Sequence, residues 1–159
     1  MRPRHPSADA PPSDARSHAV MLASPTGAFP AAAVSRAAAL AADGDREAVV
    51  LSVARIWGTA LGLPHPGLYP SRRELAQHAE AVRAAAATLG DEGITVRMQV
   101  VSARNPARAI ARSAVRAGCR SIVVVEPPTR RWERVLRASP SSEVSRRTRI
   151  AVEGVPAGS

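Results

Sequence analysis

The residues of this sequence that could do chemistry are concentrated in one segment, which follows a short apolar run. Residues 121–126 (Ser-Ile-Val-Val-Val-Glu) are typical of a strand buried on both faces, as in a parallel sheet covered by helices. In a doubly wound sheet, the loop after a central strand is where a ligand binds. Here that loop places Arg130, Arg134 and Arg137 on one helical face near Trp132, and such a set can hold phosphate and stack on a base. We favour the structural alternative, a capping helix whose Trp132 covers the end of the sheet.

Few other residues compete for a chemical role. Cys119 is the single cysteine, which excludes an internal disulfide and a cysteine-rich metal site, and we expect it to be packed. There is no P-loop, no Gly-x-Gly-x-x-Gly, no histidine pair at metal spacing and no nucleophile elbow, so neither catalysis nor a metal is predicted. His78 borders the apolar stripe of its helix and is expected to be a partly buried structural residue.

Two further features leave a functional alternative open. Arg108, Arg112 and Arg116 lie one turn apart on the outer face of a predicted helix, where like charges repel. A solvated face is favoured there over an anion-binding one. The connection over residues 55–70 carries Trp57, His65 and Tyr69, and long ordered loops are often functional. Aromatic residues that pin this loop to the body are the simpler interpretation.

The elements that must position these residues alternate between strand and helix. Strands are predicted at residues 19–23, 48–53, 94–101, 121–126 and 149–153. The helices between them are signalled by an Ala-rich stretch at 31–42, a Ser71–Glu74 capping box with Gly90 as the stop, an Asn105-Pro106 start, and residues 141–147. The fold class is therefore α/β, a five-stranded, mostly parallel sheet with helices on both faces.

One strand differs from the others in its pattern. Residues 94–100 alternate strictly, so Ile94, Val96, Met98 and Val100 should face inward while the residues between them face solvent. A half-exposed strand among buried ones belongs at a sheet edge. On the helix that follows, the inward residues should be Ile110, Ala111, Ala114 and Val115.

Composition and charge set the limits of the domain. With 159 residues and 45% hydrophobic content, the chain is one globular domain. We expect a disordered tail at 1–17, a domain at 18–153 and a short tail at 154–159. No stretch approaches the roughly 20 apolar residues of a membrane helix, and no apolar region follows the basic N-terminus. A cytoplasmic protein is therefore expected.

The charge is distributed unevenly along the chain. The formal net charge is +9, and all 22 basic residues are arginine. Residues 1–96 hold nine Arg and nine acidic residues, whereas residues 97–159 hold thirteen Arg and four Glu, so the whole excess lies in the second half. This asymmetry permits an anionic partner without identifying one.

The order of elements and three local sequences resemble the universal stress protein (UspA) family over residues 18–153. They are the strand, Ala-rich helix and strand at the start, the passage Val-Val-Ser-Ala-Arg-Asn-Pro-Ala-Arg-Ala-Ile-Ala from residue 100, and Ala-Gly-Cys-Arg-Ser-Ile-Val-Val-Val from residue 117. The resemblance implies a Rossmann-like fold of the adenine nucleotide alpha hydrolase type with strand order 3-2-1-4-5. That order agrees with the edge position inferred from alternation alone.

The resemblance also implies where a nucleotide site would lie. ATP-binding members carry Gly-x-x-Gly, nine residues, then Gly-Ser/Thr after the fourth strand, because glycines let backbone amides approach phosphates. In this chain Glu126, Thr129 and Ser139 occupy the glycine positions, with Pro140 next, and Ser24 stands where such members place an acidic residue. The degenerate site comprises Ser24, Val53, Glu126, Thr129, Arg130, Ser139, Ser141 and Ser142. ATP is not expected to bind.

The function implied is a non-enzymatic, stress-related regulatory protein of the non-ATP-binding type. It would act as a homodimer through contacts with other macromolecules, including a protein partner. Family members commonly dimerise through the final strand, here Arg149, Ile150, Ala151, Val152 and Glu153. Antiparallel pairing about Ala151 would place Arg149 opposite Glu153 of a second copy. Two alternatives remain: a nucleotide binder whose rebuilt loop uses Arg130 and the Ser141-Ser142 hydroxyls, and an arginine-rich module for nucleic acid or an acidic protein.

Overall fold

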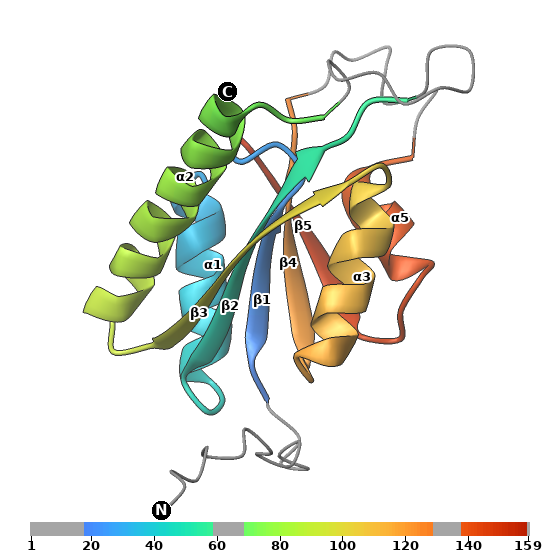
Figure 1. Ribbon diagram of the computed structural model, residues 1–159. Helices are drawn as coiled ribbons and strands as arrows, with labels where there is room; N and C mark the ends of the chain where they lie inside the picture. Colours follow the sequence, from blue (N-terminus) through green and yellow to red (C-terminus); the bar gives the residue numbers. More distant parts are fainter. Residues whose placement is uncertain (1–17, 59–68, 129–137, 159) are drawn as a thin grey trace, which may run out of the picture.

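The computed structural model describes residues 18–58, 69–128 and 138–158, which form one sheet with helices on both faces (Figure 1). The predicted tail at 1–17 and the predicted helical segment at 129–137 lie outside the described residues. In chain order the elements are β1 (Val20–Ser24), α1 (Ala31–Ala42), β2 (Glu47–Arg55), α2 (Arg72–Asp91), β3 (Thr95–Ala103), α3 (Pro106–Arg116), β4 (Ser121–Glu126), α5 (Pro140–Ser145) and β5 (Ala151–Pro156).

The sheet has the order β3-β2-β1-β4-β5, as the resemblance implied. All four neighbouring pairs are parallel, so every carboxyl end lies at the same edge. The direction in which successive strands are added reverses between β1 and β4, and open α/β sheets bind ligands at such a point. β3 lies at one edge, which confirms the inference from its alternation.

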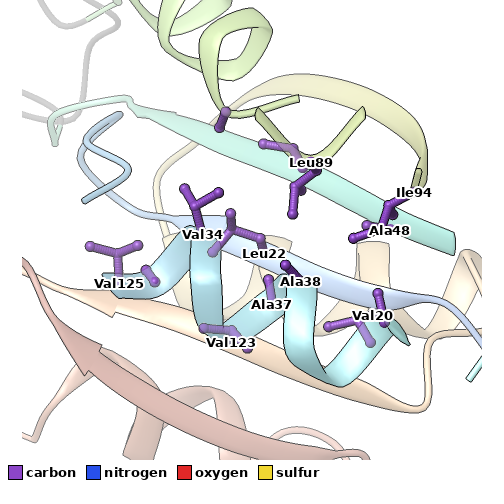
Figure 2. Close-up of a cluster of buried hydrophobic side chains, with 14 of the residues drawn as sticks. Val20, Leu22, Val34, Ala37, Ala38, Ala48, Leu89, Ile94, Val123 and Val125 are labelled. Carbon is purple, nitrogen blue, oxygen red and sulfur yellow. The ribbon is translucent and has the colours of Figure 1, made fainter. Parts of the chain in front are cut away.

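Strand side chains alternate between two separate cores. Val20 and Leu22 of β1 face α1 and α2, whereas Met21 and Ala23 face α3 and α5. Figure 2 shows the first core, in which Val34, Ala37 and Ala38 of α1 pack on the strands. The small alanine side chains let α1 lie close to the sheet, and the helix predicted at 31–42 is confirmed.

Local signals set the starts of the helices. The capping box of α2 is complete, since Glu74 N–H donates to Ser71 Oγ at 3.2 Å and Ser71 N–H donates to Glu74 Oε2 at 2.6 Å. Asn105 caps α3, and Pro106 opens it. The predicted stop of α2 was wrong: the helix runs through Gly90 to Asp91, and Gly93, at φ +76°, provides the left-handed turn into β3.

Three other expectations need correction. Met98, expected to face inward, is 54% exposed, although Val96 and Val100 on the same side of β3 pack against the α1/α2 core. Val115 of α3 is 62% exposed rather than packed. The final strand is Ala151–Pro156 instead of 149–153, so residues 154–156, expected in a tail, pair with β4. Among the residues described, no helix is long and apolar enough to cross a bilayer.

Candidate functional site

The carboxyl ends of β1, β2 and β4 meet at the edge of the sheet where the degenerate site was predicted. Ser24 ends β1 and is in register with Ser52 of β2, and both side chains are fully buried. Ser24 follows the alternation of Leu22 and therefore lies on the α1/α2 face. The end of β4 carries Glu126 on the opposite face, toward α5 (Figure 1). The predicted positions are thus divided between the two faces of one edge.

Glu126 bonds to the start of α5. Its Oε1 accepts a hydrogen bond from Ser141 N–H at 3.0 Å. The first N–H groups of a helix have no partner within the helix and carry partial positive charge. A carboxylate is a stabilising partner for such a group, so the Glu126 side chain occupies one of the free donors at the start of α5.

Three serines complete the first turn of α5. Ser139 is the N-cap, and its Oγ accepts from Ser142 N–H at 3.3 Å. The same Oγ lies 3.1 Å from Ser141 Oγ and 2.8 Å from Ser142 Oγ. Pro140 follows at the first helical position, where it has no N–H to offer. The Ser139 hydroxyl and the Glu126 carboxylate therefore each accept from a backbone N–H of this short helix, and the Ser139 hydroxyl also contacts the other two serine hydroxyls.

The Glu126 carboxylate lies close against the backbone of Gly154. Gly154 lies in β5, and a Cβ added to it would sit 2.6 Å from Glu126 Oε1 and 2.8 Å from Ser141 Oγ. The backbone of Glu126 is held too, because its carbonyl accepts from Ala157 N–H at 2.9 Å. Sequence reasoning did not find this role, although a lone glycine within a strand often marks a close approach.

A second polar contact lies on the α1/α2 face. Ser52 Oγ and His78 Nδ1 are 2.5 Å apart, and the imidazole covers Gly27, whose φ is +83°. A Cβ on Gly27 would lie 2.9 Å from the ring. Burial lowers the pKa of His78, and the charge of Glu74 opposes that shift. His78 is half-buried as expected, whereas Ser52, a polar residue within an apolar run, was overlooked.

The remaining predicted site residues that the structure describes form no hydrogen bond with Glu126 or with the serines of α5. The Val53 side chain is fully buried in the α3/α5 core, and Ser24 Oγ accepts from Thr26 N–H at 3.3 Å. Thr129 and Arg130 lie outside the described residues. Cys119 is buried, which raises its pKa to about 11 against a weaker, opposite effect of Arg97. No group of three metal-ligating side chains occurs in the described part of the chain.

Known proteins share this fold and its sequence pattern. The model of the universal stress protein family matches residues 27–153. UspA from Lactobacillus plantarum has a similar structure, with a TM-score of 0.66 and 17% identity over 87% of this chain and 97% of that one. A family protein from Burkholderia pseudomallei gives a TM-score of 0.60 and 20% identity, over 89% and 98% of the two chains.

A universal stress protein crystallised in complex with cAMP is also similar, with a TM-score of 0.61, 16% identity and coverage of 89% and 98%. No curated protein sequence matches the chain. At these identities the solved structures establish the fold, and the family model, which spans most of the chain, establishes the family. The chain belongs to the universal stress protein family.

Proposed function

We propose that this chain is a universal stress protein of the non-ATP-binding type, which acts without catalysis through contacts with other macromolecules in the cytoplasm. The observation that carries the proposal is the hydrogen bond from Ser141 N–H to Glu126 Oε1, 3.0 Å long. It places a fixed negative charge at the helix start where a nucleotide phosphate would need donors.

The energetic cost to a triphosphate is large enough to matter. A hydrogen bond to a charged group contributes about 1.5–3 kcal/mol, which is lost if Glu126 is displaced. If Glu126 stays, one phosphate charge about 4 Å away is repelled by up to about 4 kcal/mol at an effective dielectric constant of 20. Since about 1.4 kcal/mol is a factor of ten in affinity, either route is large enough to weaken ATP binding by about tenfold.

The local backbone supports the same conclusion. Gly154 leaves room for the Glu126 side chain, so the close approach that glycine makes possible at this point serves a carboxylate. Pro140 removes one donor amide from the first turn of α5. The cAMP complex belongs to a protein of 16% identity, so cAMP is a second ligand to test on this chain.

Two described residues that could act as nucleophiles, Ser52 and Cys119, have low chemical reactivity. Ser52 contacts His78, but its side chain is fully buried, so a substrate could not reach the hydroxyl. The raised pKa of Cys119 keeps its thiol protonated near neutral pH. Both observations favour a binding protein over an enzyme.

Dimerisation through β5 is part of the proposal, with a changed register. β5 is an end strand with one unpaired side, which can template another strand. The antiparallel pairing centred on Ala151 fits poorly, because β5 starts there and Arg149 lies outside it. Glu153 is already engaged, since Arg36 of α1 donates to it at 2.9 Å. A pairing centred near Gly154 uses the strand as observed.

Two measurements test the proposal. Thermal melting with millimolar ATP, and separately with cAMP, should move the melting temperature by less than one degree, since a ligand stabilises only above its dissociation constant. A rise of several degrees with ATP would refute the proposal. Sedimentation at micromolar concentration should show a dimer that Val152→Pro weakens. Ala157 N–H donates to the Glu126 carbonyl of β4, so alternation along β5 turns the N–H of Val152 toward the open edge, where proline removes a donor that an added strand would use.

A further inference from the structure

A basic groove lies at the opposite end of the sheet from the nucleotide site. It is lined by residues where α3 ends, where β4 and β5 begin, and in the turn that joins α5 to β5. Its volume is about 840 Å³, within the range of ligand-binding clefts. The side chains that matter for binding are His18, Val115, Arg120, Arg146, Arg147 and Arg149.

The groove has an uncompensated positive charge. Its lining includes four arginines and no Asp or Glu. Arg146, Arg147 and Arg149 are exposed, and none of their guanidinium groups forms a hydrogen bond or ion pair with a residue the structure describes. Glu143, three and four residues before the first two, forms no such pair with them. Arg120 differs, because its guanidinium donates to the Leu40 carbonyl of α1.

Repulsion among three neighbouring arginines is relieved when an anion binds between them. Guanidinium groups present forked donors that match phosphate oxygens, and they stay charged at any physiological pH. The absence of acidic partners among the described residues leaves these donors available. The groove is therefore built to accept a strongly anionic ligand.

The cationic surface extends beyond the groove along α3. Arg108, Arg112 and Val115 share a face of this helix, since they are separated by four and three residues. All three are exposed, and Val115 forms part of the groove wall. At 1.5 Å per residue, the row from Arg108 to Val115 is about 10 Å long. The two arginines of this row, together with those of the groove, can contact successive phosphates, which a single small anion would not use.

We propose that the groove and the α3 row bind the phosphodiester backbone of a nucleic acid. A protein partner would need an apolar patch at the centre of the contact. Val115 is the one large exposed apolar side chain among the residues of the groove and the row. Backbone phosphates need only the cations, and the whole net charge of +9 lies in residues 97–159.

This inference names a partner class for the proposed macromolecular contacts, but it depends on the groove and the α3 row and not on the nucleotide site. ATP binding at the other end of the sheet would refute the proposed function and leave this site intact. Conversely, loss of nucleic-acid binding would leave the non-ATP-binding proposal standing.

The test is fluorescence anisotropy with labelled single-stranded RNA and DNA of one sequence, between 50 and 200 mM salt. The full-length protein is compared with the triple variant Arg146→Ala, Arg147→Ala, Arg149→Ala. The matched control is Arg72→Ala, Arg73→Ala, Arg83→Ala, which removes the same charge from exposed positions on α2. The groove variant should bind at least tenfold more weakly than the control. Its slope of log K against log salt should fall by about 2, at about 0.7 per lost phosphate contact.

A second pair of variants guards against a folding defect in the triple variant. Val115→Glu puts a carboxylate on the groove wall, and Val115→Gln is its neutral match at the same exposed position. The Glu variant alone should weaken binding severalfold. Equal loss in the groove and control triples, absence of salt-dependent binding by the wild type, or tighter binding of poly-glutamate than of either nucleic acid would overturn the proposal. RNA and DNA results together show which backbone is preferred.

Discussion

Gly154→Ala tests whether the Glu126 carboxylate is held between β5 and α5. The added Cβ would lie 2.6 Å from Glu126 Oε1, 2.8 Å from Ser141 Oγ and 3.1 Å from Glu126 Cγ. Contacts below 3.0 Å essentially never occur for real Cβ atoms. The serine hydroxyl can rotate away, but the carboxylate must leave its place and release Ser141 N–H.

The expected cost follows from the bond that is lost. A hydrogen bond to a charged group contributes about 1.5–3 kcal/mol, and Glu126 is half-buried, so water recovers part of it. Removing a glycine from a strand returns about 0.5–1 kcal/mol of backbone entropy. The net loss in free energy of unfolding is about 1–2 kcal/mol, which lowers the melting temperature by about 2–4 °C per kcal/mol in a chain of this size.

Urea denaturation followed by circular dichroism measures this cost, and a double-mutant cycle identifies its cause. In a Glu126→Ala background the collision with the carboxylate is gone and only the entropy gain remains, so Gly154→Ala should cost about 1.5–3 kcal/mol less than in the wild type. Gly90→Ala is the matched control: nothing lies within 4 Å of its added Cβ, and it should stabilise α2 by about 0.5–1 kcal/mol. A Gly154→Ala protein as stable as the wild type, or equally destabilised in both backgrounds, would refute the reasoning.

Two further predictions concern buried titratable groups. Burial lowers the pKa of His78 in the folded state below its ordinary value of 6.5, so the unfolded chain binds its proton first as pH falls. The contribution of His78 to stability is therefore complete above pH 6.5 and is lost as pH falls through the lowered folded pKa. In His78→Gln the urea midpoint of unfolding should change less between pH 7 and pH 5 than it does in the wild type. The same change with pH in both proteins would contradict this. Burial raises the pKa of Cys119 to about 11, so a thiol reagent at pH 7.5 should modify it slowly in the native protein and rapidly in urea. Fast modification without urea would show that the thiol is accessible.

The sequence was sufficient for the sheet because its strongest signals are local. Continuous apolar runs located the buried strands, and alternation placed β3 at an edge. The burial of a single side chain was harder to predict where it depends on whether another element packs over that residue. Met98 has the inward phase of its strand yet is exposed between the packed Val96 and Val100, and Val115 lies on the exposed face of α3.

The motif positions of the family pointed to Glu126 and the serines of α5, and the structure brings these residues into contact. The motif positions did not reveal that the carboxylate itself bonds to the helix start, because this depends on the approach of Gly154 from a strand 28 residues later. Ser52 was missed for a similar reason, since its partner His78 comes from a distant helix.

Native mass spectrometry, before and after incubation with millimolar ATP, tests the central claim most directly. We predict a dimer of twice the 16.6 kDa chain mass, with no nucleotide attached under either condition. Subunits that carry the added mass of ATP, or of a nucleotide retained through purification, would contradict the claim that Glu126 closes the phosphate site.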